Sequence, residues 1–258
     1  FAAHHNNLTR NNGTVRGNGE GITIIQSAHN ELYFNRGAGT SYYGFYIQDS
    51  DSDNTTLFGN TFTSQASRAA VIESEYNNLT NNSFYSDDDL GLYVYASSHN
   101  TITKSRFVSN SSRALFLSTT STNNTLSHNN ITGAYQSLRF EQADDNIVTY
   151  SNIWAHDGAA VYVTNVDNLT LRHNYLQTNT TNGLYTQSTN NSIFVNNTAN
   201  VSSGGAFRIG PNSQNNNLTS NTGLATTGQG FRVENATQNS FYNNTANTSG
   251  TGTGFLLE

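Results

Sequence analysis

Residues 77–94, NNLTNNSFYSDDDLGLYV, contain every part of a motif that repeats along the chain. Asn77 and Asn82 lie five positions apart with an apolar residue between them, and a Phe follows two positions later. Gly91 then precedes two apolar residues that are separated by one polar position. Apolar and polar residues that alternate in pieces of three to five indicate short β-strands with one buried face.

The same motif continues on both sides of this stretch. Its second Asn position, in some copies occupied by Ser, falls at residues 11, 35, 60, 82, 105, 129, 151, 174, 196, 221 and 244. The block of one small and two apolar residues recurs at the same spacing. Short strands at this interval, joined by turns of Asn, Gly, Asp and Ser, predict a parallel β-solenoid in which each repeat is one coil. We therefore expect an all-β chain, a single right-handed parallel β-helix of about eleven 22–25-residue coils, with residues 1–258 as one domain and no helical domain.

Stacking of the coils predicts how like residues are placed. Strands of neighbouring coils should lie about 4.8 Å apart, so eleven coils make a rod of roughly 50 Å. The apolar positions then form a continuous core that no single coil could bury alone. The Asn positions are expected to form inward side-chain ladders at the corners, where Asn tolerates a left-handed backbone conformation. Asn196 is assigned to such a ladder, and is therefore not expected to carry a glycan.

Composition excludes several function classes. Charged residues make up 11% of the chain, against roughly 25% in an average domain, and the net charge is −6. With Lys104 as its single lysine, the chain has no basic patch for nucleic acid. No apolar run of about 18 residues is present, so no membrane span is predicted. Cysteine is absent, which excludes disulfides, thiolate metal sites and a cysteine nucleophile.

The repeat resembles that of NosD-like proteins in the pectin-lyase-like superfamily of right-handed parallel β-helices. The matching pieces are residues 123–131, which combine the two Asn positions with apolar residues, and Gly91–Val94. The resemblance covers about residues 5–258 and implies the fold. It leaves the function open, since that superfamily contains lyases, hydrolases, epimerases, phage tailspikes, adhesins and surface-layer proteins. The Asn-, Thr- and Tyr-rich composition is similar to that of secreted β-helix proteins on archaeal cell surfaces, which implies an extracellular or cell-surface location.

One outward column combines aromatic and basic side chains. The residue between the two apolar positions of each block points outward, and eight of these residues form a stripe: Tyr46, Tyr93, Phe116, Tyr162, Tyr185, Arg139, Arg208 and Arg232. Such a stripe suits sugar stacking and protein packing equally well. It is interpreted as an assembly surface, as a glycan-binding surface, or as a consequence of strand propensity alone.

The sequence assigns no catalytic set. Retaining glycoside hydrolysis needs two carboxylates about 5 Å apart, and inversion needs about 6.5–9.5 Å. The candidates are Glu141, on the same strand as Arg139, with His156 and Asp157 in the following coil. The Gly-His-Gly and Arg-x-Lys pieces of the polygalacturonase type and the Asp-Pro-His-Glu piece of alginate epimerases are absent. Whether the chain is an enzyme is left open, with binding or a structural role favoured.

One sequence feature weakly suggests a metal site. His5, His29 and Asp53 are expected to share the turn column before the ladder Asn, one coil apart. Imidazole and carboxylate groups can bind Zn²⁺ or Cu²⁺, but about 5 Å between neighbours is long for one shared ion. No metal site and no cofactor are therefore assigned, although the NosD name is associated with copper.

Sequons of the form Asn-x-Ser/Thr are frequent. Four of them lie at positions predicted to point outward, and these are the glycosylation candidates: Asn7, Asn78, Asn130 and Asn217. They could carry glycans if the chain is exported through a glycosylating pathway.

The two ends of the sequence are expected to match each other. Neither carries a polar cap of the kind solenoids use to prevent stacking, and joining Glu258 to Phe1 of a second copy would preserve the register. We therefore expect end-to-end self-association or membership in a longer solenoid. We therefore favour a secreted or cell-surface structural protein that forms a rigid rod, filament or sheath. The alternative is a polysaccharide-binding or polysaccharide-cleaving module, or a tailspike-like adhesin, with surface glycans as partners.

Overall fold

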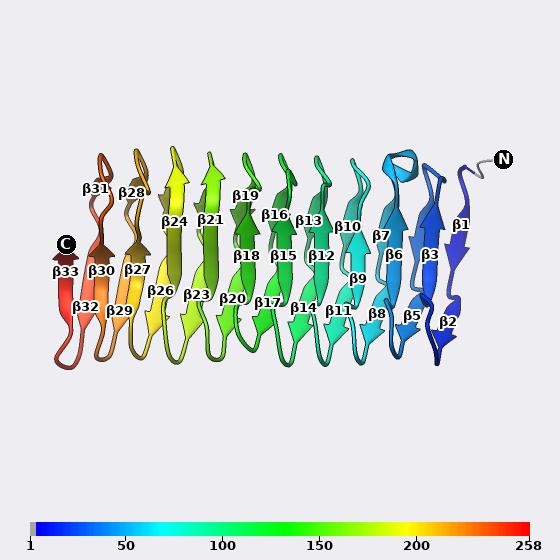
Figure 1. Cartoon of the computed structure of the whole chain (residues 1–258), viewed down its shortest axis with the longest axis horizontal. Helices are drawn as coiled ribbons and strands as arrows, with labels where there is room; N and C mark the ends of the chain where they lie inside the picture. The colour runs from blue at the N-terminus through cyan, green and yellow to red at the C-terminus, as the bar shows by residue number, and fades with distance from the viewer. Residues whose placement is uncertain (1–3) are drawn as a thin grey trace.

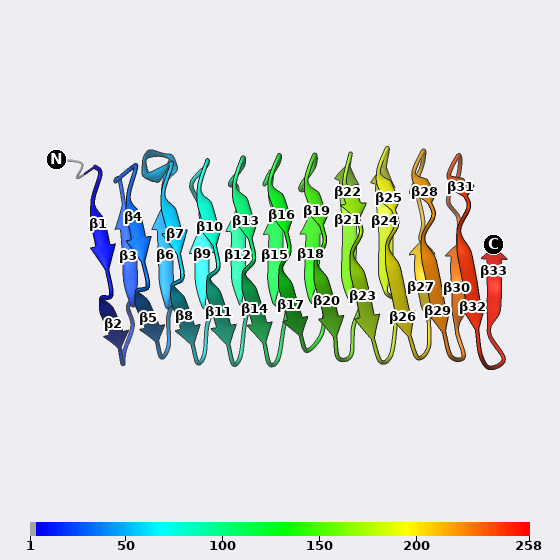
Figure 2. The same cartoon turned by 180° about the vertical axis from the view of Figure 1, so that it is seen from behind.

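The computed structural model describes residues 4–258 as a single right-handed parallel β-helix (Figure 1). Thirty-three strands form three parallel sheets of eleven strands each, and every coil contributes one strand to each sheet. Figures 1 and 2 show the coils stacked along one axis, with β1 and β33 at opposite ends of the rod. The predicted fold class, the eleven coils and the near absence of helix are confirmed.

The three sheets differ in strand length. Sheet A has three-residue strands: β1 (Asn7–Thr9), β4 (Glu31–Tyr33), β7 (Thr56–Phe58), β10 (Asn78–Thr80), β13 (Thr101–Thr103), β16 (Thr125–Ser127), β19 (Ile147–Thr149), β22 (Thr170–Arg172), β25 (Ile193–Val195), β28 (Asn217–Thr219) and β31 (Ser240–Tyr242). Sheet B has four-residue strands: β2 (Asn12–Val15), β5 (Arg36–Gly39), β8 (Thr61–Ser64), β11 (Ser83–Ser86), β14 (Arg106–Ser109), β17 (Asn130–Gly133), β20 (Asn152–Ala155), β23 (Tyr175–Thr178), β26 (Thr198–Val201), β29 (Thr222–Ala225) and β32 (Thr245–Thr248). Sheet C has strands of three to seven residues: β3 (Ile22–Ile25), β6 (Phe45–Gln48), β9 (Ala70–Ile72), β12 (Leu92–Tyr95), β15 (Leu115–Ser118), β18 (Leu138–Glu141), β21 (Val161–Asp167), β24 (Leu184–Asn190), β27 (Gly205–Ile209), β30 (Gln229–Val233) and β33 (Thr253–Leu257).

The core is built from stacked columns of apolar side chains, and at the second and third coils the volumes on sheets B and C compensate. Gly37 of sheet B precedes Phe45 of sheet C in one coil, and in the next coil the order is Phe62 and then Ala70. The rings of Phe45 and Phe62 stack with centroids 4.4 Å apart and are fully buried. A Cβ on Gly37 would lie 2.2 Å from the carbonyl oxygen of Gly44, so only glycine fits there. These two coils therefore fill the same cross-section with a different division of volume, as close packing requires.

Two buried ladders of Asn, Ser and Thr line the turns on either side of sheet A. In the turn from sheet A to sheet B, Oδ1 of Asn82 accepts from the backbone N–H of Asn60 at 2.9 Å, and Nδ2 of Asn82 donates to the carbonyl of Leu57 at 2.9 Å. The bonds satisfy backbone groups that the tight turn removes from the sheet. The ladder member of the ninth coil is Asn197, which is buried, whereas Asn196 is exposed with φ 53°. The prediction that Asn196 points inward is therefore wrong.

The residue before each ladder position adopts the left-handed conformation, and most of these residues are not glycine. Lys104 has φ 51° and its N–H donates to the carbonyl of Ser127 in the next coil at 3.0 Å. This bond between coils offsets the cost of the conformation. The one helical segment in residues 4–258 is the 3₁₀ turn η1 (Ser50–Ser52), in a coil where ladder residues Asn35 and Asn60 lie 25 positions apart. In the described part of the chain, no helix has the length and apolar composition that crossing a membrane needs.

Candidate functional site

The predicted stripe forms one column on the outer surface of sheet C. Parallel pairing in register joins, in order, Thr23, Tyr46, Val71, Tyr93, Phe116, Arg139, Tyr162, Tyr185, Arg208, Arg232 and Leu256. All eight residues of the predicted stripe belong to this column. Their rings and guanidinium groups are partly buried rather than freely exposed.

Guanidinium groups cover the ring faces of this stripe. Arg68, from the turn before β9, lies over the ring of Tyr93 with its Cζ 4.6 Å from the centroid. Arg139 lies 5.3 Å from the ring centroid of Phe116 and 5.2 Å from that of Tyr162. Nε of Arg68 lies 3.4 Å from Oδ2 of Asp89, whereas Nε of Arg139 is buried without a hydrogen-bond partner. The attraction between cation and ring replaces that bond, and it leaves little ring surface for a ligand to stack on.

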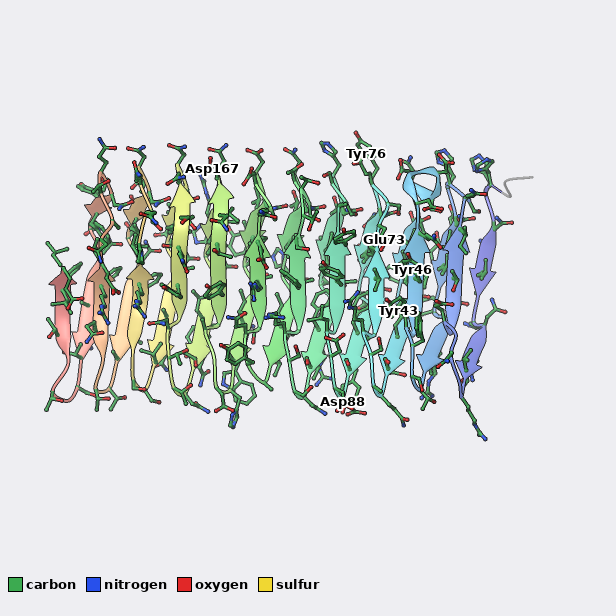
Figure 3. The ribbon with its side chains drawn as sticks, in the orientation of Figure 1. Tyr43, Tyr46, Glu73, Tyr76, Asp88 and Asp167 are labelled. Atoms are coloured by element: carbon green, nitrogen blue, oxygen red, sulfur yellow. The ribbon has the colours of Figure 1, made fainter. Side chains whose placement is uncertain are left out.

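The hydroxyl groups of the stripe are also engaged. Tyr46 donates to Oε2 of Glu73 at 2.6 Å, and Figure 3 shows both side chains beside Tyr43 over β6 and β9. Burial, and then the bond to Glu73, raise the pKa of the Tyr46 phenol well above its ordinary value. The hydroxyl of Tyr93 lies 2.7 Å from that of Ser118. These groups stabilise the surface itself.

Ion pairs neutralise the three arginines of the stripe. Two of these pairs join residues of one strand face: Arg139 bonds Glu141 at 2.8 Å, and Arg232 lies 3.4 Å from Glu234. Glu234 also accepts a bond of 2.6 Å from Arg208 in the preceding coil, which holds the pKa of its carboxyl below the ordinary value. With rings covered and charges paired, the assignment of the stripe as a glycan-binding or assembly face stays a prediction.

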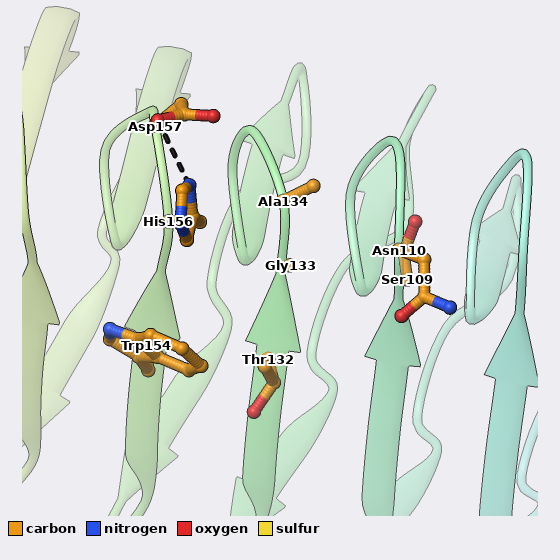
Figure 4. Close-up of a pocket in the computed structure, with 8 residues that line it drawn as sticks. All are labelled: Ser109, Asn110, Thr132, Gly133, Ala134, Trp154, His156 and Asp157. Atoms are coloured by element: carbon orange, nitrogen blue, oxygen red, sulfur yellow. Dashed lines mark ion pairs between the residues drawn. The ribbon is translucent and has the colours of Figure 1, made fainter.

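The structure brings together two of the three catalytic candidates. Nδ1 of His156 lies 2.9 Å from Oδ1 of Asp157, on the turn that follows β20 (Figure 4). Glu141 lies on sheet C, where its carboxylate pairs with Arg139. It does not belong to the set of residues around His156. The histidine and aspartate are both well exposed, at 60% and 64% of their side-chain surface.

A surface hollow of about 400 Å³ opens beside this pair, at the corner between sheets B and C. We call it the corner hollow, and its lining residues are Ser109, Asn110, Thr132, Gly133, Ala134, Trp154, His156 and Asp157. Figure 4 shows the Trp154 ring close to edge-on, reaching from β20 toward Thr132, with His156 and Asp157 on the turn above. Trp154 is 38% exposed, and its ring lies 6.4 Å from that of His156 in an edge-to-face arrangement.

The hollow exists because the preceding coil carries small residues at the same turn. Ala134 and His156 occupy equivalent positions, since each N–H donates to the strand end of the coil before it. A large side chain therefore stands next to a small one, and the space between them stays open. Sequence analysis did not select Trp154, although the alternation of sheet B predicts that the third strand position points outward.

A second hollow of about 360 Å³ lies on the same sheet, at the corner between sheets A and B. Its lining residues are Tyr150, Ser151, Asn152, His173, Asn174, Tyr175, Asn196 and Thr198. The rings of Tyr150 and His173 stack with centroids 4.9 Å apart. Tyr175 is 39% exposed and accepts a bond of 3.3 Å from Nδ2 of Asn200. We call this site the second hollow.

The candidate metal residues do not converge. The rings of His5 and His29 stack 4.8 Å apart with only 7° between their planes. Two parallel rings in separate planes cannot both direct an in-plane nitrogen at one ion. Asp53 has an extended backbone and lies one position before the turn column, which Asn54 occupies in that coil, so the expected column position of Asp53 is wrong. Among residues 4–258, no three His, Cys, Asp or Glu side chains form a group that could hold a metal ion.

The four glycosylation candidates are all exposed. On sheet A, Oδ1 of Asn7, Asn78 and Asn217 accepts a hydrogen bond from the sequon threonine, at 2.7, 3.0 and 2.8 Å. Asn130 lies on sheet B and pairs with Asn152 of the next strand. Their accessibility agrees with the predicted outward positions, and their modification stays a prediction.

Comparison with known protein families gives two matches. Residues 1–155 and 70–182 match the family described as periplasmic copper-binding protein (NosD). Residues 135–257 match the family described as right handed beta helix region. A search of curated proteins gave no match.

Solved structures share the fold at low sequence identity. The periplasmic alginate epimerase AlgG, as a T265N T268M double mutant, is 16% identical over 85% of this chain with a TM-score of 0.54. The Dettilon tailspike protein (gp208) is 13% identical over 98% with a TM-score of 0.60, and the mannuronan C-5 epimerase AlgE4 A-module from Azotobacter vinelandii is 10% identical over 98% with a TM-score of 0.57. The chain spans 50% of the length of AlgG and 60% of that of the tailspike. These likenesses concern the fold.

The donor set of this chain does not fit a copper centre. Cu(I) is held by thiolate and thioether ligands, and Cu(II) by sets of nitrogen and oxygen donors in which imidazole is common. The chain contains no Cys and no Met, and the ring planes of His5 and His29 are parallel. Within residues 4–258, no third His, Asp or Glu joins that pair as a metal-binding group. The copper binding in the family description therefore has no counterpart in the described residues.

Proposed function

The chain belongs to the NosD family of right-handed β-helix proteins, and on this premise we propose that it is a secreted or envelope module that binds polysaccharide on the outer face of sheet B. The observation that carries the proposal is the corner hollow, where the exposed ring of Trp154 borders the polar side chains of Asn110, His156 and Asp157. A concave site that combines an aromatic surface with a few polar groups is the usual form of a small-ligand site.

Sugar chemistry fits these groups. A sugar ring has an apolar C–H side, which packs on an aromatic surface, and hydroxyl groups, which need donors and acceptors. Trp154 provides the surface, and Asn110 and Asp157 provide hydrogen-bonding groups within the same hollow. The likeness to an alginate epimerase supports the proposal to the extent that the same solenoid serves a protein acting on a polysaccharide.

Binding is proposed rather than cleavage. Both common mechanisms of glycoside hydrolysis use a pair of carboxylates that flank the bond to be cleaved. The lining of the corner hollow contains one carboxylate, Asp157, and its oxygen faces the ring of His156. Structural assembly from end to end stays a prediction.

The test is a glycan array probed with the labelled chain, produced in a host that adds no glycans. We expect retention on at least one class of polysaccharide, and loss of that retention in Trp154→Ala. The matched control is Tyr95→Ala on sheet C, because Tyr95 is also aromatic and 38% exposed. Circular dichroism checks that both variants keep their β-structure. Absence of retention on every polysaccharide, or equal retention by wild type and Trp154→Ala, would refute the proposal.

A further inference from the structure

The two hollows open on the same sheet, at opposite ends of one strand. Trp154 lines the corner hollow and Asn152 lines the second hollow, and both belong to β20. Residues two positions apart on a strand point to the same face. Asn152 and Trp154 therefore connect the two hollows across the outer surface of sheet B.

Exposed rings stand at both hollows. Tyr175 of β23 pairs in register with Asn152, and Trp154 pairs with Gln177. The two rings are thus offset along neighbouring strands, with one at each hollow. Both are more than a third exposed, unlike the rings of the sheet C stripe, whose faces guanidinium groups and neighbouring rings cover. The arrangement provides two stacking surfaces on one path.

The lining groups carry almost no net charge. Ser, Thr and Asn make up three of the eight lining residues of the corner hollow and five of the eight of the second hollow, and no Arg or Lys is among the described lining residues. The one carboxylate, Asp157, lies within 2.9 Å of His156. An acidic sugar would find no arginine or lysine to offset its charge, whereas hydroxyl groups would find both donors and acceptors.

We infer that the ligand is an uncharged oligosaccharide that crosses sheet B along the strand direction, from the corner hollow to the second hollow. The inference rests on the proposed function and adds the ligand's class, direction and minimum length. Ser151 lines one hollow and His156 the other, and five residues of extended chain span about 16 Å. A single sugar ring cannot cover that distance, so only a longer ligand fills both hollows.

The experiment uses the fluorescence of Trp154, which is the only tryptophan in the chain. Uncharged probes are glucose, maltotriose, maltohexaose, cellohexaose, laminarihexaose and mannohexaose, and the charged probe is a galacturonic acid hexamer. We expect at least one neutral hexasaccharide to change the emission, and to bind about tenfold or more tightly than its monosaccharide. Tyr175→Ala should remove most of that gain, because the second stacking surface is lost, while Trp154 still reports on the corner hollow.

A filled corner hollow provides a second variant. Ala134→Gln places a larger side chain in the hollow, and Gln65 already occupies the equivalent turn position in its own coil, so the fold accepts the residue. We expect hexasaccharide binding to weaken about tenfold or more. The matched control is Thr226→Gln, at the same turn position away from both hollows, and it should bind as the wild type does.

The outcomes separate this inference from the proposed function. A hexasaccharide that binds no more tightly than its monosaccharide, an unchanged Tyr175→Ala or Ala134→Gln variant, or a preference for the galacturonic acid hexamer would overturn the inference alone. If no neutral probe changes the emission of Trp154 but retention on the array depends on Trp154, the inference alone would also be overturned. If no neutral probe changes the emission of Trp154 and no polysaccharide on the array retains the chain, the inference and the proposed function would both be overturned.

Discussion

Asn174 offers the sharpest test of the ladder that joins the coils. It is buried, and its Oδ1 accepts from the N–H of Ser151 at 2.9 Å. Its Nδ2 donates to the carbonyl of Val148 and to Oδ1 of Asn197, both at 3.0 Å. Asn174→Ala removes all three bonds, whereas Asn174→Ser introduces the residue that Ser105 and Ser151 place in the same column.

The expected magnitudes follow from which backbone group is left unpaired. In Asn174→Ala the buried N–H of Ser151 loses its partner, which costs about 1–3 kcal/mol, and the lost amide bonds bring the total to about 3 kcal/mol. In Asn174→Ser the hydroxyl can accept that N–H, as the hydroxyl of Ser105 accepts the N–H of Asn82 at 3.1 Å. That variant should lose only about 1 kcal/mol.

Thermal unfolding followed by circular dichroism measures the difference. In a chain of this size, 1 kcal/mol shifts Tm by about 2–4 °C, so we expect a fall of about 10 °C for Asn174→Ala and about 3 °C for Asn174→Ser. Asn152→Ala is the control, because Asn152 is exposed on sheet B, and it should shift Tm by less than about 2 °C. Equal shifts for the two Asn174 variants, or a control shift as large as that of Asn174→Ala, would refute the reasoning.

Three further predictions concern titration and modification. Because burial and Glu73 raise the pKa of Tyr46, its phenol should ionise after the exposed tyrosines in an ultraviolet titration, and Glu73→Gln should lower that pKa. The neutral phenol contributes stability that is present below pH 10 and is lost as the pH rises through the pKa of the folded state. Because Arg208 lowers the pKa of Glu234 from 4.5, the Glu234 carboxylate contributes stability above pH 4.5 that is lost on acidification. Acid unfolding of Arg208→Gln should therefore depend less strongly on pH than that of the wild type. An equal dependence on pH in the two proteins would contradict this prediction. In a glycosylating host, peptide mapping should find glycans at the exposed sequons, and a glycan at Asn130, beside Asn152, should weaken saccharide binding on sheet B; full binding with Asn130 occupied would argue against the sheet B site.

The repeat predicts the fold because one residue type recurs at each position of the coil. The sheet C column was predicted residue by residue, since small-apolar-x-apolar blocks have only one alternation that buries both apolar residues. In the ninth coil the sequence does not decide which residues point inward, because Ile193, Phe194 and Val195 are all apolar and either of the two Asn residues that follow could be the ladder residue. Pairing of Phe194 with Leu218 turns Phe194 inward and makes Asn197 the ladder residue.

The candidate site was harder to predict because it depends on differences between coils. His156 and Asp157 were selected as an adjacent pair, but the space beside them depends on Ala134 and Gly133 in the preceding coil. Arg208 pairs with Glu234 of the next coil, and Arg232 lies near both Glu234 and Glu258. Which carboxylate a long side chain reaches is information that a repeat pattern does not contain. Similarly, the ladder residue of the third coil is Thr55, so Asn54 rather than Asp53 fills the turn column.

The coil is also the unit by which such a chain can change length. Each strand pairs only with strands of the neighbouring coils, so duplication or loss of a whole coil would preserve every other pairing. Loss of a single strand residue would instead turn the rest of that strand inside out. The 25-position interval from Asn35 to Asn60 contains η1 at a corner, where extra residues leave the strands in register. Evolutionary insertions and deletions should therefore fall into two classes: whole coils, and short additions at the corners.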